Sequence, residues 1–136
     1  MQRLTRRADF LQAARGRRFA MPGLVLQMAA RPQDPDGPMR VGFTVSRKVG
    51  NAVRRNRARR RLKEAAARVM PRAGLPGHDY VVIGRQGTLT RPFALLLSDM
   101  EQALARVHRS PARTGARRRR SPPPGSADPF PSADGA

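Results

Sequence analysis

The chain contains no cysteine and no tryptophan, and aromatic residues make up only 4% of its 136 residues. The absence of cysteine excludes disulfides, a thiol nucleophile and a thiolate zinc site. It also permits a reducing compartment, so we expect a cytoplasmic protein. No run of about 18 apolar residues occurs, and the opening MQRLTRRADF lacks the apolar core of a signal peptide. We therefore predict neither a membrane span nor a membrane partner.

Acidic residues are also scarce. Only nine Asp and Glu stand against 28 Lys and Arg, which gives a formal charge of +19 and a pI near 12.0. Such an imbalance predicts a polyanionic partner rather than a neutral metabolite. Lys48 and Lys63 are the only lysines, so almost all of the positive charge is arginine, which grips phosphate bidentately and stacks on bases. RNA suits this chemistry better than a membrane surface.

A change in composition divides the chain near residue 110. Residues 110–136 are rich in Pro, Gly, Ser and Ala, and we predict a disordered, basic, Pro-rich tail there. This segment holds five arginines and two aspartates, which leaves 23 basic and 7 acidic residues, a formal charge of +16, in residues 1–109. One domain of residues 1–109 is long enough to bury a modest core and carries most of the charge.

Apolar residues that alternate along the chain predict the strands. Residues 24–30 and 40–46 alternate in this way, and a further short strand is possible around residues 17–20. Residues 79–84 are apolar on both faces, which predicts a central strand. Together with the helices, these strands give the order α-β-β-β-α-β-α and a four-stranded sheet of the α+β class.

Three helices are predicted from their period and their end signals. The first lies between Thr5, which we expect to cap it, and Gly16. The second covers residues 52–70 and is expected to stop at Pro71. The third opens at Pro92, and its core-facing stripe consists of Phe93, Leu96, Leu97, Met100, Leu104 and Val107.

The most informative segment is SRKVGNAVRRNRARRRLKEAAAR, from Ser46 to Arg68. At about 100° per residue, its apolar side consists of Ala58, Leu62, Ala65, Ala66 and Val69. Its charged and polar side consists of Asn56, Arg57, Arg60, Arg61, Lys63, Glu64 and Arg68. Like charges at this spacing repel, and phosphate would relieve the repulsion, so the segment predicts a nucleic-acid contact. Glu64, the only acid here, is expected to pair with Arg60 or Arg68.

The same segment resembles the bacterial ribonuclease P protein subunit. The string VGNAVRRNRARRRLKEA is similar to the RNR motif of that family, here Arg55, Asn56 and Arg57. RVGFTVSRKVG, HDYVVIGR and the ADF of the first helix extend the resemblance over most of residues 5–107. It implies a sheet of about four strands with three helices. It also implies a left-handed crossover for the RNR helix, although the general rule favours the right-handed form.

The resemblance implies the function as well. The protein would bind the catalytic RNA of ribonuclease P and the 5′ leader of precursor tRNA, and assist endonucleolytic removal of the leader. The ribonucleoprotein would be the endoribonuclease, while the chemistry and its Mg²⁺ requirement would belong to the RNA. We therefore expect no catalytic residue, metal site or cofactor on the protein, and one protein per RNA.

By the same resemblance, contacts to the catalytic RNA are expected from Arg47, Lys48, Asn51, Arg55, Asn56, Arg57, Arg59 and Arg60. The leader is expected in a cleft between the first helix and the sheet, bound by Phe10, Arg17, Arg18, Gln27, Thr44 and Ser46. Ala14 and Gln27 stand where relatives often carry aromatic residues, which should weaken stacking on the leader. Phe10 is also open to a role as a core aromatic.

Two other classes stay open, a ribosomal RNA-binding protein and an architectural DNA binder, although the RNR segment favours ribonuclease P. His78 and His108 lack partners at metal-ligand spacing, and we expect them to be structural or exposed. Asp34 and Asp36 are expected to shape a turn. The sequence contains no Gly-rich phosphate loop, HExxH or Gly-x-Ser-x-Gly, so an autonomous active site is not expected.

Overall fold

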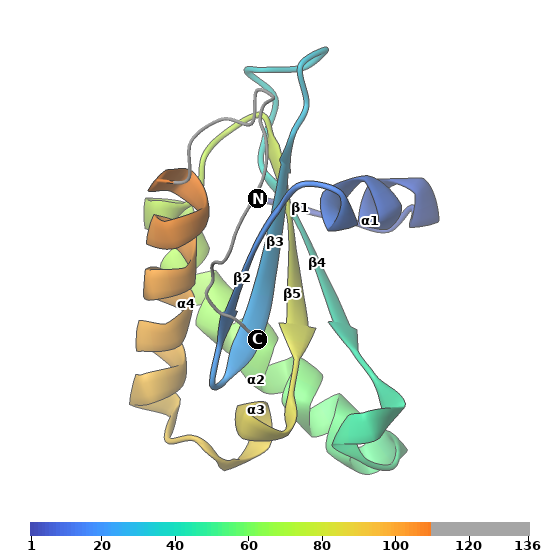
Figure 1. Cartoon of the computed structure of the whole chain (residues 1–136), viewed down its shortest axis with the longest axis vertical. Coiled ribbons are helices and arrows are strands. Elements are labelled where there is room, and N and C mark those ends of the chain that lie inside the picture. The colour runs from blue at the N-terminus through green and yellow to red at the C-terminus, as the bar shows by residue number, and fades with distance from the viewer. Residues whose placement is uncertain (110–136) are drawn as a thin grey trace, which may run out of the picture.

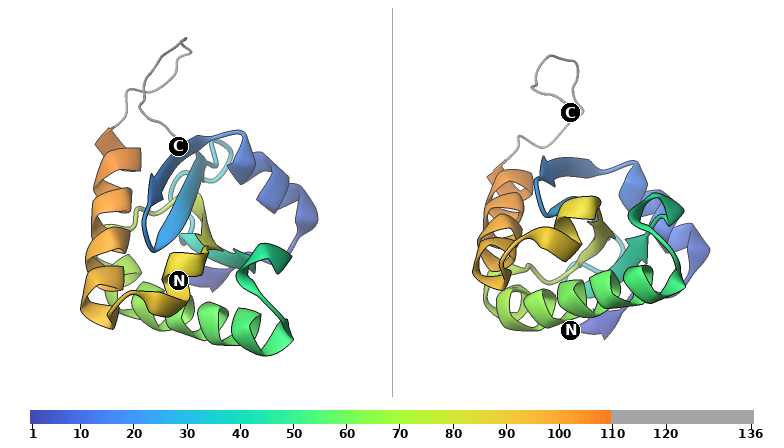
Figure 2. Two further views of the ribbon diagram at one scale, coloured as in Figure 1. Left: turned by 60° about the horizontal axis from the view of Figure 1, so that its bottom comes forward. Right: turned by 90° about the horizontal axis from the view of Figure 1, so that it is seen from below.

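The computed structural model describes residues 1–109, in which helices cover both faces of one five-stranded sheet (Figures 1 and 2). The strands are β1 (Gln2–Arg3), β2 (Arg17–Met21), β3 (Leu24–Ala30), β4 (Arg40–Val45) and β5 (His78–Gly84). The helices are α1 (Arg7–Ala14), α2 (Ala52–Ala73), α3 (Gln86–Thr90) and α4 (Phe93–Arg109), with a 3₁₀ turn η1 (Arg47–Val49). The predicted α+β class is confirmed, with β1, η1 and α3 added. The predicted tail lies outside the described residues.

The strands lie in the order β1-β4-β5-β3-β2, which places β5 at the centre of the sheet as its apolar sequence predicts. β1, β4 and β5 are parallel neighbours, whereas β3 runs antiparallel to both β5 and β2. Paired residues on neighbouring strands point to the same face of a sheet. One such row crosses four strands and consists of Gly42, Val81, Gln27 and Arg18.

The connection from β4 through α2 to β5 is left-handed. In Figure 1 both strands run downward, β5 lies to the left of β4, and α2 passes behind the sheet. The view from below in Figure 2 places α2 on that same side. The chain therefore departs from the usual right-handed rule in the way that the family resemblance implies.

The main core lies between the sheet and the pair α2 and α4. The apolar side predicted for α2 is buried in full and extends to Met70. In α4, the predicted stripe is buried at four positions and half-buried at Phe93 and Leu97. A smaller cluster fills the opposite face beneath α1 and consists of Leu4, Phe10, Ala13, Ala29, Val81 and Ile83. Two hydrophobic layers thus hold the sheet from both sides.

Some helix boundaries differ from the prediction. Arg6, not Thr5, precedes α1, and no side chain caps that helix. Pro71 lies inside α2, which continues to Ala73 and closes with a 2.8 Å hydrogen bond from the Gly74 N–H to the Met70 carbonyl. A proline so close to a helix end removes a single ladder bond, and the buried end of α2 stays packed on the core.

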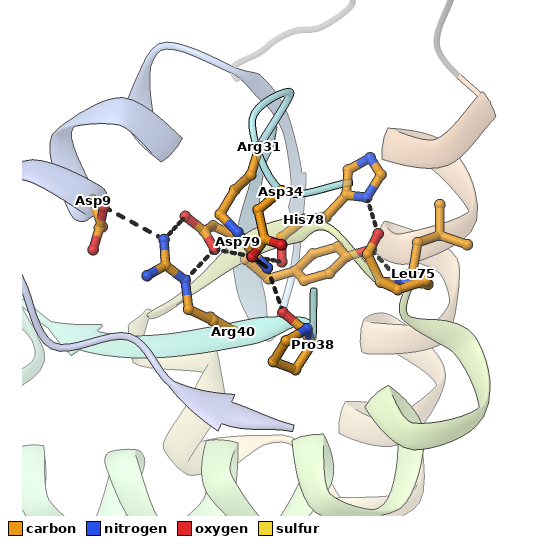
Figure 3. A network of polar contacts seen from close by, with 10 residues as sticks. Asp9, Arg31, Asp34, Pro38, Arg40, Leu75, His78 and Asp79 are labelled. Atoms are coloured by element: carbon orange, nitrogen blue, oxygen red, sulfur yellow. Dashed lines mark hydrogen bonds and ion pairs between the residues drawn. The ribbon is translucent and has the colours of Figure 1, made fainter. Parts of the chain in front are cut away.

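A buried ionic cluster joins β4, β5 and the loop that follows β3 (Figure 3). Asp79 opens the buried part of β5 and is only 3% exposed. Its Oδ1 accepts hydrogen bonds from Arg31 Nη1 at 2.7 Å and Arg40 Nε at 2.8 Å, and its Oδ2 accepts one from Arg40 Nη2 at 2.7 Å. Arg40 also lies 3.5 Å from Asp9 of α1, and Arg31 donates to the Pro38 carbonyl at 2.6 Å. The cluster therefore fixes α1 and the loop before β4 to the central strand.

The two arginines decide the charge state of Asp79. Burial by itself raises the pKa of this carboxyl, but the hydrogen bonds and charges of Arg40 and Arg31 outweigh it and bring the pKa below its ordinary value of 3.8. The hydrogen bond to Asp79 likewise raises the pKa of Arg40. Since the folded-state pKa of Asp79 is depressed, its ionic contribution is complete above pH 4 or so and is lost as the pH falls through the folded-state value.

We predict that Asp79→Asn lowers the free energy of unfolding by about 3 kcal/mol at neutral pH, because it removes the buried carboxylate that pairs with Arg31 and Arg40 and leaves the buried Arg31 with only the exposed Asp34. Urea denaturation measures this change. Asp34→Asn is the matched control, since Asp34 pairs with the same arginine at 3.2 Å but its side chain is 54% exposed. It should cost about 0.5 kcal/mol or less. Equal losses in the two variants would contradict a special role for the buried carboxylate.

Candidate nucleic-acid interface

The cationic face of α2 divides into a free half and a paired half. Arg57 and Arg60 are exposed and have no acidic partner within residues 1–109. Near the C-terminal end, Arg68 binds Glu64 at 3.0 Å, which confirms one of the two predicted pairings. Arg72 binds Glu101 of α4. The unneutralised charge of α2 is therefore concentrated in its N-terminal half.

The three residues of the RNR motif do not point the same way. Arg55 lies seven residues before Leu62, so it shares the packed side of the helix, and its Nε is buried without a hydrogen-bond partner. Asn56 is exposed and accepts a 3.1 Å hydrogen bond from Arg59 Nη1. Arg57 faces solvent. A single arginine of the motif is thus freely accessible, and the first one is held against the protein.

Arg61 is a correction to the helical wheel, which places it on the cationic face. Its Nε donates to the Thr88 carbonyl at 2.8 Å, and its Nη2 donates to the Arg91 carbonyl. Carbonyls at the end of a short helix lack intrahelical partners, and a guanidinium that reaches them satisfies both at once. Phe93 lies beside the same guanidinium, 5.8 Å from its Cζ to the ring centroid. Arg61 therefore holds α3 and the start of α4 against α2.

In the segment that leads into α2, two side chains cap the start of a helical turn. Ser46 Oγ accepts from the Lys48 N–H at 3.3 Å, and Asn51 Oδ1 accepts from the Arg54 N–H at 3.0 Å. Gln86 of α3 donates to the Lys48 carbonyl at 2.7 Å. Arg47 and Lys48 are exposed on this fixed turn. The caps place both cations beside the free half of α2, while Ser46 and Asn51 use their side-chain oxygens within the protein.

A cleft of about 550 Å³ lies between α1 and the sheet, on the face opposite α2. Three predicted leader residues, Phe10, Gln27 and Thr44, line this cleft. The other lining residues are Thr5, Arg7, Phe43, Val81 and Ile83. No acidic residue lines it. Because the Phe43 side chain packs against the main core on the far face, the cleft combines the ring of Phe10 and an apolar floor with a basic and polar rim.

Phe10 is at once a cleft residue and a packing residue. Its half-buried ring lies over Gly42 of β4, where a Cβ would approach Phe10 Cζ to 2.6 Å. Any side chain at this position would force the ring to move away from β4. The ring therefore packs within the domain and also lines the cleft, and Gly42, which makes room for it, was not among the predicted site residues. The sequence does mark this position, because a glycine inside a strand of alternating apolar residues often lies where another group approaches the backbone closely.

The remaining predicted leader residues lie elsewhere. Arg18 lines a second hollow, of about 590 Å³, at the C-terminal end of α1. Arg17 also borders this hollow, but its Nη1 donates to the Val107 carbonyl of α4 at 2.9 Å, on the far face of the sheet. Ser46 lines neither hollow and caps η1. Ala14 is exposed on α1.

Comparison with known proteins identifies the family. The Ribonuclease P family pattern matches residues 1–108. The ribonuclease P protein component of Paramagnetospirillum magneticum is 58% identical over 110 residues, which cover 79% of this chain and 83% of that protein. The chain belongs to the ribonuclease P protein family. The protein component of Ruegeria pomeroyi is 52% identical over 106 residues, or 77% of this chain and 85% of that protein.

Solved structures of ribonuclease P proteins share the fold. The Thermotoga maritima protein superposes with a TM-score of 0.64 at 28% identity, covering 78% of this chain and 97% of that one. The Staphylococcus aureus protein gives a TM-score of 0.63 at 27% identity, covering 77% and 94%. The ribonuclease P fold thus extends over the domain that carries both the α2 surface and the α1 cleft.

The histidines of this ribonuclease P protein have structural partners, as expected. His108 Nε2 lies 2.8 Å from Tyr80 Oη, which accepts a 2.9 Å hydrogen bond from the Leu75 N–H. Burial raises the pKa of Tyr80 to about 12, and burial followed by the charges of His78 and Arg17 lowers the pKa of His108. Within residues 1–109 no three His, Asp or Glu side chains converge as metal ligands would. No helix among these residues is long and apolar enough to span a membrane.

The two kinds of arginine on α2 should respond differently to substitution. We predict that Arg61→Met lowers the free energy of unfolding by about 2 kcal/mol, because two carbonyls lose their charged donor. Arg57→Met, on the same helix, should stay within about 0.5 kcal/mol of the unsubstituted protein because Arg57 is exposed and has no acidic partner in the described domain. Urea denaturation of both variants tests the assignment. A larger loss for Arg57→Met would reverse it.

Proposed function

We propose that this chain serves ribonuclease P through two surfaces, one on each face of its sheet. It is the protein subunit of that ribonucleoprotein, an endoribonuclease that matures the 5′ end of tRNA and whose catalytic part is RNA. Its partners are accordingly the ribonuclease P RNA and the tRNA substrate. The proposal concerns which residues meet each partner.

The free half of α2 is the observation that carries the proposal for the catalytic RNA. Arg57 and Arg60 present guanidinium groups without acidic partners in the described domain, and Arg47 and Lys48 extend the same cationic surface along η1. On the same half of α2, Arg59 donates a hydrogen bond to Asn56, and this pair can meet the edge of an RNA base. In this proposal Arg55 and Asn51 mainly position the helix, the first by packing and the second by capping.

The cleft beneath α1 is the proposed site for the leader. A single-stranded RNA offers bases for stacking on Phe10 and 2′-hydroxyls for Gln27 and Thr44, while Arg7 meets phosphate. Arg18 stays in the proposed leader site because it shares a row with Gln27, whereas Arg17 and Ser46 do not. One aromatic ring supports stacking of about 1–3 kcal/mol per base, so most of the binding free energy for the leader must come from polar and charged groups.

The division of labour follows from the residues present. The chemistry and its Mg²⁺ belong to the RNA in this proposal, and the protein positions the substrate and screens phosphate repulsion with its arginines. We further propose one protein per catalytic RNA, a cytoplasmic site of action, and an RNA-binding domain that ends near residue 109.

Reconstitution tests the function directly. The protein alone should leave precursor tRNA intact at every Mg²⁺ concentration, and adding it to ribonuclease P RNA should restore cleavage at a low Mg²⁺ concentration at which the RNA alone is slow. The measurement is the initial rate of 5′ leader release. If the protein gives no stimulation, or binds duplex DNA as tightly as the catalytic RNA at matched salt, the assignment to ribonuclease P is wrong.

The α2 surface has its own test. We predict that Arg57→Gln with Arg60→Gln weakens binding to the catalytic RNA about tenfold or more and lowers the salt slope by up to about 0.9 for each phosphate that the variant no longer neutralises. The control is Arg68→Gln with Arg72→Gln, which removes the same charge from α2 at residues already neutralised by Glu64 and Glu101. It should cost much less. Filter-binding titrations at several salt concentrations measure both, and equal losses would contradict the division of α2 into two halves.

A further inference from the structure

The second hollow has the chemistry of an anion site. It lies at the C-terminal end of α1 and is lined on one side by Gln12 and Arg15 of the helix region and on another by Arg18 of β2. Arg15 and Arg18 are exposed, and no acidic residue lines the hollow. The other lining residues are Gly16, Arg17, Met28, Ala29, Ala30 and His78. Two exposed guanidinium groups without a carboxylate in the lining favour a phosphate ligand.

The sheet register connects this hollow to the leader cleft. Arg18 pairs with Gln27, Gln27 pairs with Val81, and the latter two line the cleft. The row continues through Val81 to Gly42 beneath Phe10. From β4 to β2 the row covers three strand spacings, about 14 Å, which is the length of about four stacked nucleotides. A strand that enters at Phe10 can therefore reach Arg18 without leaving this face.

The backbone holds the hollow open. A Cβ at Gly16 would collide with the Met28 carbonyl, so glycine lets the end of α1 lie directly on β3. Arg17 is anchored on the opposite face by its bond to Val107, and alternation along β2 then directs Arg18 toward α1. Ala29 and Ala30 have small side chains, which leave room above the sheet for a sugar-phosphate chain.

We propose that Arg15 and Arg18 form a second leader subsite, which binds phosphates of the leader nucleotides farther from the cleavage point. This inference rests on the proposed function of the α1 cleft. Thr44 lies two residues before Ser46, the cap of η1, so the Thr44 end of the cleft adjoins the surface assigned to the catalytic RNA. The nucleotides next to the scissile bond then lie near Thr44, and the distal ones extend along the row to Arg18. Gln12 supplies an amide donor for a phosphate oxygen or a 2′-hydroxyl.

The experiment compares precursor tRNAs whose leaders have about two or about eight nucleotides, lengths that end before or extend past the Phe10 to Arg18 row. The measurement is the dissociation constant of the reconstituted holoenzyme for each substrate. In Arg15→Gln with Arg18→Gln, we expect the advantage of the long leader over the short one to fall about fivefold, as two charge-assisted contacts at an exposed site would require. The control, Arg72→Gln with Arg106→Gln, removes the same charge from α2 and α4 and should keep that advantage.

The possible results distinguish failure of the second subsite from failure of the proposed leader cleft. If the unsubstituted holoenzyme binds both leaders equally, the cleft proposal itself fails. If it prefers the long leader and the Arg15 and Arg18 variant keeps the full preference, the second subsite is wrong while the cleft stands. An equal loss for both leaders also overturns the subsite, because only general electrostatic attraction would then be affected. If the variant melts early, a photoreactive nucleotide near the far end of the leader should crosslink to residues 12–18 of the intact protein, and crosslinking elsewhere would refute the path.

Discussion

Two guanidinium groups converge on the carboxylate of Asp79, and the arrangement of the domain depends on this contact. Asp79 lies in the central strand. Arg40 links this strand to β4 and, through Asp9, to α1, and Arg31 links it to the loop that follows β3. The Asp9–Arg40 pair and the smaller apolar cluster together hold α1 over the face of the sheet that forms the cleft. Removing one partner of a buried ion pair leaves an uncompensated charge, so the contact constrains the fold more strongly than its net energy suggests.

The distribution of acids, rather than of arginines, shapes the electrostatics of the surface. Asp79 and Asp99 are buried, and Asp99 pairs with Arg91 and accepts a 2.9 Å hydrogen bond from the Gly23 N–H. Glu64 and Glu101 neutralise the C-terminal part of α2. None of these carboxylates lies on the α1 cleft, the second hollow or the free half of α2. The positive charge of these three surfaces is thus not neutralised by the carboxylates, which favours RNA binding there.

Periodicity predicted much of the fold because the large elements bury regular faces. The apolar side of α2, the strand over residues 24–30 and the central place of β5 follow from spacing alone. Contacts between distant residues could not be found this way: the partners of Asp79 lie 48 and 39 residues away, and β1 has only two residues. A helical wheel also gives the side of the helix on which a residue lies, but not the groups that a long side chain can contact. It placed Arg61 on the cationic face and could not reveal the carbonyls of Thr88 and Arg91 that hold this side chain.

The RNR motif illustrates the same limit at the candidate site. Three adjacent polar residues must point in three directions on a helix, so they cannot all face one partner equally. The buried Nε of Arg55, the bonded amide of Asn56 and the exposed Arg57 divide the motif into positioning and contact roles. On the other face, Phe10 is the one aromatic side chain of the described domain that faces the cleft, because Gln27 lines it with an amide and Phe43 packs on the main core. In the proposed site the leader is therefore held less by stacking than by arginine along a row of the sheet, which makes its binding more dependent on salt.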